Sequence, residues 1–211
     1  MGPGFRTIHQ RIIASYRGYE FYDGGDRNLG YGSFKYDGRW APIAKKMYNE
    51  YGLTETSSVL QIGCHKGFLL HDFQTQYPRM TVQGTDVSDY AIENAMPSVK
   101  KNIRKAPFME LPFEDHVFDL VIAIGPVYAL SLPDAIKCLK EIKRVGRGKS
   151  FITLGSYATE EEFRLFRHWL LLGTTVLSEG DWVEVLKHCE YSGDYCFSNA
   201  RTLHLRDGTH R

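Results

Sequence analysis

The sequence has 211 residues, of which 43% are hydrophobic and 24% are charged. These fractions are typical of a globular protein, and the length fits a single domain. The formal net charge is +1, so the chain lacks the basic excess that attracts a phosphate backbone, and we expect no nucleic-acid partner. No apolar run approaches the roughly 20 residues needed to cross a bilayer, so we also expect no membrane span.

The cysteines form no Cys-x-x-Cys pair, a spacing that is typical of zinc and redox sites. They are Cys64, Cys138, Cys189 and Cys196, and most of them stand within apolar periodic segments. Free thiols of this kind are characteristic of the reducing cytosol. We therefore expect a cytoplasmic protein with no disulfide and no metal site.

The chain is expected to form one domain over residues 1–211, with an N-terminal arm and lid over 1–39 and an α/β core over 40–206. Within the arm, residues 17–39 hold six glycines and four tyrosines without a sustained helical or strand period. This composition predicts an ordered loop that can fold over a site.

Hydrophobic periodicity predicts that helices and strands alternate along the core. The predicted helices share an apolar face that repeats every three or four residues, and they cover residues 40–51, 68–77, 89–95, 132–145, 160–172 and 181–189. The predicted strands are short runs rich in apolar and β-branched residues, and they cover residues 58–62, 80–84, 102–106, 118–124, 150–154, 194–198 and 201–205.

Strands that alternate with helices predict a Rossmann-like, doubly wound α/β fold with a mostly parallel, seven-stranded sheet. The run over residues 118–124 is almost wholly apolar, which is typical of a central parallel strand buried on both faces. The last two predicted strands are expected to form an antiparallel hairpin at the C-terminal edge of the sheet.

The turn after the strand at residues 58–62 is the expected ligand site. In an open parallel sheet, ligands bind beyond the carboxyl ends of the strands, where the strand order reverses. Gly63 permits a tight turn, Gly67 lets the next helix pack closely, and the first amides of that helix favour an anionic group. Asp86 ends the next strand, about where a carboxylate accepts hydrogen bonds from a ribose diol. Together these features predict an adenosine-containing cofactor.

The spacing of Gly63 and Gly67 lacks the third glycine of the dinucleotide fingerprint, which disfavours NAD. In their order and spacing, four segments resemble class I S-adenosylmethionine-dependent methyltransferases that act on small molecules: residues 59–70, 84–88, 111–121 and 141–145. The resemblance implies S-adenosylmethionine as cofactor and S-adenosylhomocysteine as product. It also implies a small-molecule acceptor, with a sugar as one candidate.

The resemblance further implies roles for individual residues. Those expected to hold the methionine, ribose and sulfonium parts of the cofactor are Gln61, Gly63, Cys64, His65, Gly67, Asp86, Ile124 and Gly125. Those expected to border the adenine are Val87, Phe108, Met109 and Glu110. The arm is expected to contribute Tyr31 over the cofactor and Arg39 against the methionine carboxylate.

Two side chains are candidate catalytic residues: Tyr128, which the resemblance puts beside the substrate, and His65 in the glycine turn. A phenol with an ordinary pKa of about 10 suits a pocket wall better than a general base at neutral pH. Because a sulfonium methyl is already activated, alignment can supply much of the rate, and the chemistry requires no sharp catalytic dyad.

Two alternatives remain open. Gln61 stands where the family usually carries Asp or Glu, and His65 replaces the middle glycine of the family's turn. Pro107 stands where Asp or Asn commonly binds the adenine amino group. These substitutions fit a methyltransferase-fold protein that has lost catalysis and serves as a binding or scaffolding partner. An NAD-dependent oxidoreductase is the other alternative, and the glycine spacing disfavours it.

Overall fold

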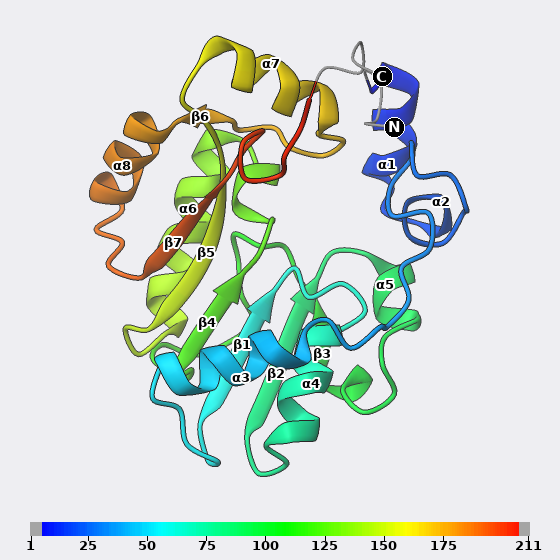
Figure 1. Cartoon of the computed structure of the whole chain (residues 1–211). Coiled ribbons are helices and arrows are strands. Elements are labelled where there is room, and N and C mark those ends of the chain that lie inside the picture. Colours follow the sequence, from blue (N-terminus) through cyan, green and yellow to red (C-terminus); the bar gives the residue numbers. More distant parts are fainter. Residues whose placement is uncertain (1–5, 207–211) are drawn as a thin grey trace.

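The computed structural model describes residues 6–206; residues 1–5 of the expected arm and residues 207–211 lie outside the described part. One sheet forms the centre of the molecule, with helices on both of its faces (Figure 1). Its strands are β1 (Ser58–Ile62), β2 (Thr81–Asp86), β3 (Ile103–Lys105), β4 (Leu120–Ala123), β5 (Ser150–Tyr157), β6 (Leu177–Ser178) and β7 (Asp194–Ser198). The strand order is β3-β2-β1-β4-β5-β6, with β7 also paired to β5. The order therefore reverses between β1 and β4.

The helices are α1 (Ile8–Ser15), α2 (Tyr19–Tyr22), α3 (Ala41–Glu50), α4 (Phe68–Gln76), α5 (Asp89–Glu93), α6 (Leu132–Val145), α7 (Glu160–Trp169) and α8 (Glu179–His188). Two 3-10 turns, η1 (Lys100–Asn102) and η2 (Val127–Ala129), complete the described elements. None of the helices within residues 6–206 has the length and apolar character that crossing a membrane requires.

The inner strands are apolar throughout because both of their faces are covered. Along β4, Leu120 and Ile122 pack with α3 and α4, whereas Val121 and Ala123 pack with α6 and α8. Successive side chains of a strand point to opposite faces, so a strand covered on both sides needs an unbroken apolar run. The predicted Rossmann-like, doubly wound α/β fold is confirmed.

Several helices begin where the sequence supplies an N-cap. The hydroxyl oxygens of Ser88, Ser131, Thr159 and Ser178 accept hydrogen bonds from the backbone amides three residues later. Each bond satisfies an amide that has no partner within its helix, which fixes the point where the helix starts. The predicted starts of α5, α6 and α7 therefore agree closely with the structure.

The arm does not run past the core as a plain loop. Residues 8–15 and 19–22 form α1 and α2, which lie beyond the end of the sheet toward which the strand arrows point (Figure 1). The arm also bonds to α7, because the amide of Arg6 donates to the carbonyl of His168 and Arg11 Nη2 donates to the carbonyl of Arg167. The arm and α7 therefore bracket the carboxyl ends of the strands.

The C-terminal edge of the sheet differs in detail from the expected antiparallel hairpin. Strand β7 follows the crossover helix α8 and pairs with β5 in parallel, as a strand–helix–strand connection requires. Residues 201–205 form turns instead of a second strand. The side chains of Asn199 and Thr202 each accept a hydrogen bond from the other's backbone amide, which turns the chain away from the sheet.

The burial of Leu60 in β1 generates a stability prediction. Replacing this fully buried side chain with alanine leaves a cavity between the sheet and α6, and we expect the free energy of unfolding to fall by about 2–5 kcal/mol. Ile8→Ala is the control, because Ile8 is 74% exposed and its loss should change stability by roughly 0.5 kcal/mol or less. Urea unfolding followed by circular dichroism measures both; equal effects would contradict the packing described.

Candidate functional site

The turn between β1 and α4 has a backbone that favours glycine at both ends. Gly63 and Gly67 have φ angles of 65° and 74°, in the left-handed region. A Cβ on Gly67 would also lie 2.9 Å from Val99 Cγ2. His65 adopts a φ of 53° between the two glycines, which is uncommon outside glycine, although histidine is among the residues enriched there. The backbone thus curls tightly at the carboxyl end of β1.

Asp86 fastens this turn to the end of β2. Its side chain is fully buried, and one carboxylate oxygen accepts a 2.7 Å hydrogen bond from the backbone amide of His65. The other oxygen accepts a 2.9 Å bond from the amide of Ser88. The Ser88 hydroxyl in turn donates to the carbonyl of Arg17 in the arm, at 2.6 Å. One carboxylate therefore holds together two of the loops at the predicted site.

The imidazole of His65 points into an aromatic cluster supplied by the arm. Its Nδ1 is hydrogen-bonded to the hydroxyl of Tyr22 at 2.8 Å, and its Nε2 lies 3.5 Å from the hydroxyl of Tyr31. Burial lowers the pKa of His65 below its ordinary value, although the carboxylate of Asp86 acts in the opposite direction. The ring is therefore neutral at pH 7.

Lys66 anchors the arm to the glycine turn, a role that its place in the sequence gave no reason to expect. Its buried ammonium forms an ion pair with Asp23 and donates to the carbonyl of Phe34 at 3.1 Å. The hydroxyl of Tyr90 donates to the same Asp23 carboxylate at 2.8 Å. Burial by itself would raise the pKa of Asp23, but the bonds from Lys66 and Tyr90 bring it below its usual value. The carboxylate is therefore ionised, and the arm is held by a satisfied polar cluster.

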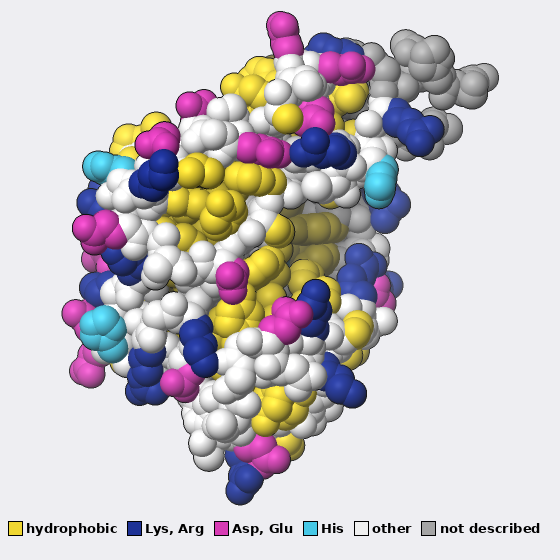
Figure 2. All heavy atoms as spheres, turned by 60° about the vertical axis from the view of Figure 1, so that its left-hand side comes forward, with side chains coloured by type: hydrophobic (Ala, Val, Ile, Leu, Met, Phe, Trp, Pro, Cys, Tyr) yellow, Lys and Arg dark blue, Asp and Glu magenta, His cyan; other side chains and the backbone are white. Residues whose placement is uncertain are grey.

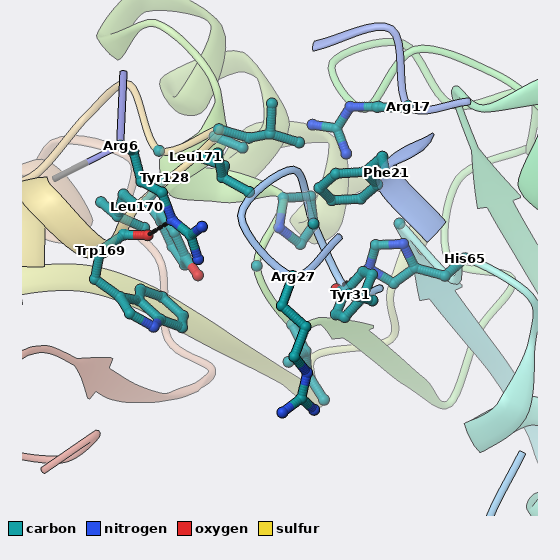
Figure 3. A pocket seen from close by; sticks show the side chains of 18 of the residues that line it. Arg6, Arg17, Phe21, Arg27, Tyr31, His65, Tyr128, Trp169, Leu170 and Leu171 are labelled. Atoms are coloured by element: carbon teal, nitrogen blue, oxygen red, sulfur yellow. Dashed lines mark hydrogen bonds between the residues drawn. The ribbon is translucent and has the colours of Figure 1, made fainter. Parts of the chain in front are cut away.

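A cavity of about 800 Å³ opens between the arm and the carboxyl ends of β1 and β4 (Figure 3). The predicted residues that line it are Tyr31, Gly63, His65, Phe108, Ile124, Gly125 and Tyr128. The predicted residues that lie outside its lining are Arg39, Gln61, Cys64, Gly67, Asp86, Val87, Met109 and Glu110. The structure thus brings segments from the arm, β1 and β4 into one space.

Gln61 and Cys64 lie behind the cavity wall. The Gln61 Oε1 atom is buried and has no hydrogen-bond partner within residues 6–206. An unpartnered buried acceptor is costly, so this atom is suited to a donor that arrives with a ligand. The thiol of Cys64 packs close to Gly84, and burial raises its pKa well above the ordinary value. Cys64 is therefore a packing residue in this conformation.

Arg39 stands apart from the cavity. Its guanidinium forms an ion pair with Asp37 two residues away, and 72% of its side chain is exposed. The resemblance assigned this residue to a carboxylate of the cofactor, and in the structure its charge is already engaged on the outer surface. The cavity draws its arginines from earlier in the arm instead, at Arg6, Arg17 and Arg27.

Tyr128 belongs to η2, directly after β4. Its ring fits against the bare backbone of Gly155, where a Cβ would lie 3.0 Å from the ring. Its carbonyl accepts hydrogen bonds from the amides of Thr174 and Thr175, which keeps the segment after α7 beside the cavity. Burial raises the pKa of Tyr128 to about 12, so the hydroxyl stays protonated at neutral pH and can donate a hydrogen bond.

Sequence reasoning missed several residues of the cavity wall. Arg6, Arg17 and Arg27 belong to no recognisable motif, and their spacing in the sequence does not indicate that they face a cavity. Residues 169–173 form the opposite wall, where the chain leaves α7. The apolar character of Trp169 and Leu170 was a usable signal, because helices that follow the fifth strand often roof a pocket in the family that the sequence resembles.

Comparisons with known proteins agree with this geometry. A family model described as a methyltransferase domain matches residues 59–148. Cycloartenol-C-24-methyltransferase from Arabidopsis thaliana is 34% identical over 103 residues, which are 46% of this chain and 30% of that protein. Malonyl-[acyl-carrier protein] O-methyltransferase from a Paenibacillus species is 28% identical over 182 residues, or 74% of this chain and 63% of that one.

Among solved structures, the YcgJ protein of Bacillus subtilis superposes with a TM-score of 0.57 at 18% identity, covering 69% of this chain and 66% of that one. At this identity, the likeness speaks for the fold alone. The chain spans less than two thirds of the length of the two curated relatives described above.

The fold and the site define an α/β protein whose glycine turn lies where the strand order reverses, the place at which open α/β sheets bind ligands. More narrowly, residues 59–148 match the methyltransferase-domain model, and the resemblance to class I S-adenosylmethionine-dependent methyltransferases is confirmed. S-adenosylmethionine, and not NAD, is the cofactor of this class of domain.

The buried ion pair generates the prediction for this site. Lys66→Met leaves the Asp23 carboxylate without its cation, and we expect the free energy of unfolding to fall by about 3 kcal/mol, with faster protease cleavage in residues 24–32. Lys105→Met is the matched control, because its ion pair with Asp89 is exposed and its loss should cost less than about 1 kcal/mol. Equal cleavage rates in the two variants would show that the arm is held by other contacts.

Proposed function

We propose that this protein transfers the methyl group of S-adenosylmethionine to an oxygen, nitrogen or carbon atom of a small-molecule acceptor. The observation that carries the proposal is the cavity, which has His65 of the glycine turn and Tyr31 of the arm on one side and Trp169 and Leu170 on the other (Figure 3). Its volume of about 800 Å³ lies within the range typical of ligand pockets. A cofactor on the first side and an acceptor on the second would meet in one space.

The residues present fit the cofactor. Gln61 Oε1, the buried acceptor without a partner, would receive a hydrogen bond from the ammonium of the methionine part. Asp86 would bind the ribose hydroxyls, because each carboxylate oxygen can accept more than the single backbone bond it has here. Phe108 lines the cavity and would stack along the adenine, with Val87 close by in the same apolar cluster.

Alignment is the main contribution that the chain itself would make to the reaction. When bound, S-adenosylmethionine supplies an electrophilic methyl group on its sulfonium and leaves as S-adenosylhomocysteine. Tyr31 and Tyr128 wall the cavity and exclude water, and the protonated hydroxyl of Tyr128 would orient the acceptor by donating a hydrogen bond. His65 lines the cavity with a neutral ring and would be the base if the acceptor loses a proton, although the lowered pKa that burial gives it makes it a weak one.

The cofactor proposal is tested by isothermal titration with S-adenosylmethionine and S-adenosylhomocysteine. Mass spectrometry of ligands released from the purified protein gives an independent answer. A screen with a labelled methyl donor then identifies the acceptor, including the sugars that the resemblance suggested. No binding of either ligand at millimolar concentration would exclude the proposed function.

Gln61 generates a sharper prediction. Gln61→Glu places a charged acceptor against the ammonium of the ligand, and we expect S-adenosylhomocysteine to bind roughly tenfold more tightly, about 1.4 kcal/mol. The matched control is 5′-methylthioadenosine, which shares the nucleoside but lacks the amino-acid part, so its affinity should not change. If both ligands gained equally, Gln61 would not be facing the ammonium.

The second candidate function, a methyltransferase-fold scaffold without catalysis, is favoured by Gln61 and by Pro107, which carries no side-chain acceptor for the adenine amino group. The double variant Gln61→Glu, Pro107→Asp distinguishes the two functions. A rise in affinity from undetectable to micromolar would indicate a degenerate site. Tight binding by the native chain together with methyl transfer would indicate an enzyme.

A further inference from the structure

The charged side chains that line the cavity are all of one sign. Three of the described residues that line it are arginines, Arg6, Arg17 and Arg27, and none of those residues is an aspartate or glutamate. His65, which also lines the cavity, is neutral. For the chain as a whole, basic and acidic residues nearly balance at 26 and 25, and side chains of both signs are interspersed on the face shown in Figure 2, so the excess inside the cavity is a local feature. Such a concave, positively charged site attracts anions.

The guanidinium groups form no direct ion pair with an acid in the described part of the chain, although Asp26 lies near enough to Arg6 to attract it electrostatically. Among the ion pairs formed within residues 6–206, none involves Arg6, Arg17 or Arg27. Arg6 donates only to neutral acceptors, the Asn28 side chain at 3.2 Å and the Trp169 carbonyl at 3.5 Å. These bonds orient the group without neutralising it; burial lowers the pKa of Arg6, as does the neighbouring Arg11, while Asp26 acts in the opposite direction and offsets the charge in part.

The cofactor would neutralise only part of the positive charge of the three arginines. S-adenosylmethionine carries a sulfonium and an ammonium against one carboxylate, so its own net charge is positive. Its carboxylate can pair with one of the three arginines. Arg17 is the arginine on the cofactor side, because its guanidinium lies over the ring of Phe108 at 5.9 Å. Arg6 and Arg27 therefore remain for the acceptor.

Arg6 and Arg27 lie outside the side of the cavity that we assign to the cofactor. In Figure 3, Arg6 is beside Tyr128 and Trp169, on the side away from His65, and Arg27 lies between the two sides. The surrounding wall is apolar, with Trp169 followed by three leucines in residues 170–172. A charged group and an apolar surface therefore meet in the same half of the cavity.

We propose that the methyl acceptor is an amphiphilic anion, whose carboxylate or phosphate group binds Arg6 and Arg27 and whose apolar body packs against residues 169–172. This inference rests on the proposed function, because it names the class of acceptor for the same cavity. The planar fork of an arginine can bind either anion through two hydrogen bonds. Because the wall beside these arginines is apolar, we expect an amphiphilic anion to bind more tightly than a free inorganic ion.

The test uses the full chain saturated with S-adenosylhomocysteine and four probes of equal length: octanoate, octyl phosphate, octanol and octylamine. Binding is followed by tryptophan fluorescence, since Trp169 lines the cavity, and by titration calorimetry. We expect the two anions to bind at least tenfold more tightly than octanol, and octylamine to bind most weakly. The ratio between octanoate and octyl phosphate tells which anion the site prefers. No binding of any probe, or equal binding of octanol and the anions, would overturn the inference.

Substitutions of the two arginines test whether their side chains bind the anion. Arg6→Gln and Arg27→Gln should each weaken the two anions by roughly tenfold or more, the loss expected for one charged hydrogen bond, and should leave octanol unchanged. Arg27 lies in an exposed loop, so its variant remains informative if Arg6→Gln does not fold. Arg79→Gln is the matched control, because Arg79 pairs with Glu55 far from the cavity. If both cavity variants bound the two anions as tightly as Arg79→Gln does, the assignment of Arg6 and Arg27 to the anion would be wrong.

The same measurements separate this inference from the proposed function. If S-adenosylhomocysteine binds but the anions show no dependence on Arg6 or Arg27, the acceptor class is wrong and the methyltransferase proposal stands. If S-adenosylhomocysteine does not bind, the titrations are repeated without it. Arginine-dependent binding of octanoate would then keep the anion site while the methyltransferase proposal fails.

Discussion

The buried ion pair between Lys66 and Asp23 is the interaction on which the candidate site depends. Lys66 belongs to the glycine turn after β1, and Asp23 belongs to the arm, 43 residues earlier. Because both charged groups are largely out of water, each needs the other, and neither segment can move away cheaply. The pair places α2 and Tyr22 over His65 and thereby closes one wall of the cavity. Other contacts also hold the arm, among them the bonds from Arg11 to α7 and from Ser88 to Arg17, but the ion pair is the one that joins the arm directly to the glycine turn through buried charges.

The polar groups around the turn serve two different purposes. Asp86 is bonded to backbone amides on both sides, and the cluster of Lys66, Asp23 and Tyr90 is satisfied internally. These groups keep the loops rigid. Gln61 Oε1 and the arginines of the cavity, in contrast, lack the partners that burial or charge demands. In a folded protein such groups are explained most simply by a ligand; the arginines line the cavity, and Gln61 lies just outside its lining.

The fold could be predicted well from sequence because its signals are local. The unbroken apolar run of β4, the serine caps of α5 and α6, and the glycines of the turn each act within a few residues, and all agree with the structure. The C-terminal edge was harder. Residues 201–205 contain strand-like residues, but the bonds between Asn199 and Thr202 favour a turn, and β7 was placed by the crossover through α8.

The site was predictable to the extent that it follows from the strand ends. The sequence by itself determined the doubly wound sheet, the glycine turn and Asp86, because hydrophobic periodicity and positive φ angles depend on neighbouring residues. Only the tertiary structure decided that Lys66 is buried, that Arg39 faces outward and that Arg6, Arg17 and Arg27 face the cavity. The physical reason is that the arm has no period of its own. Its side chains acquire their surroundings from contacts with segments far along the chain, such as α7 and the turn after β1.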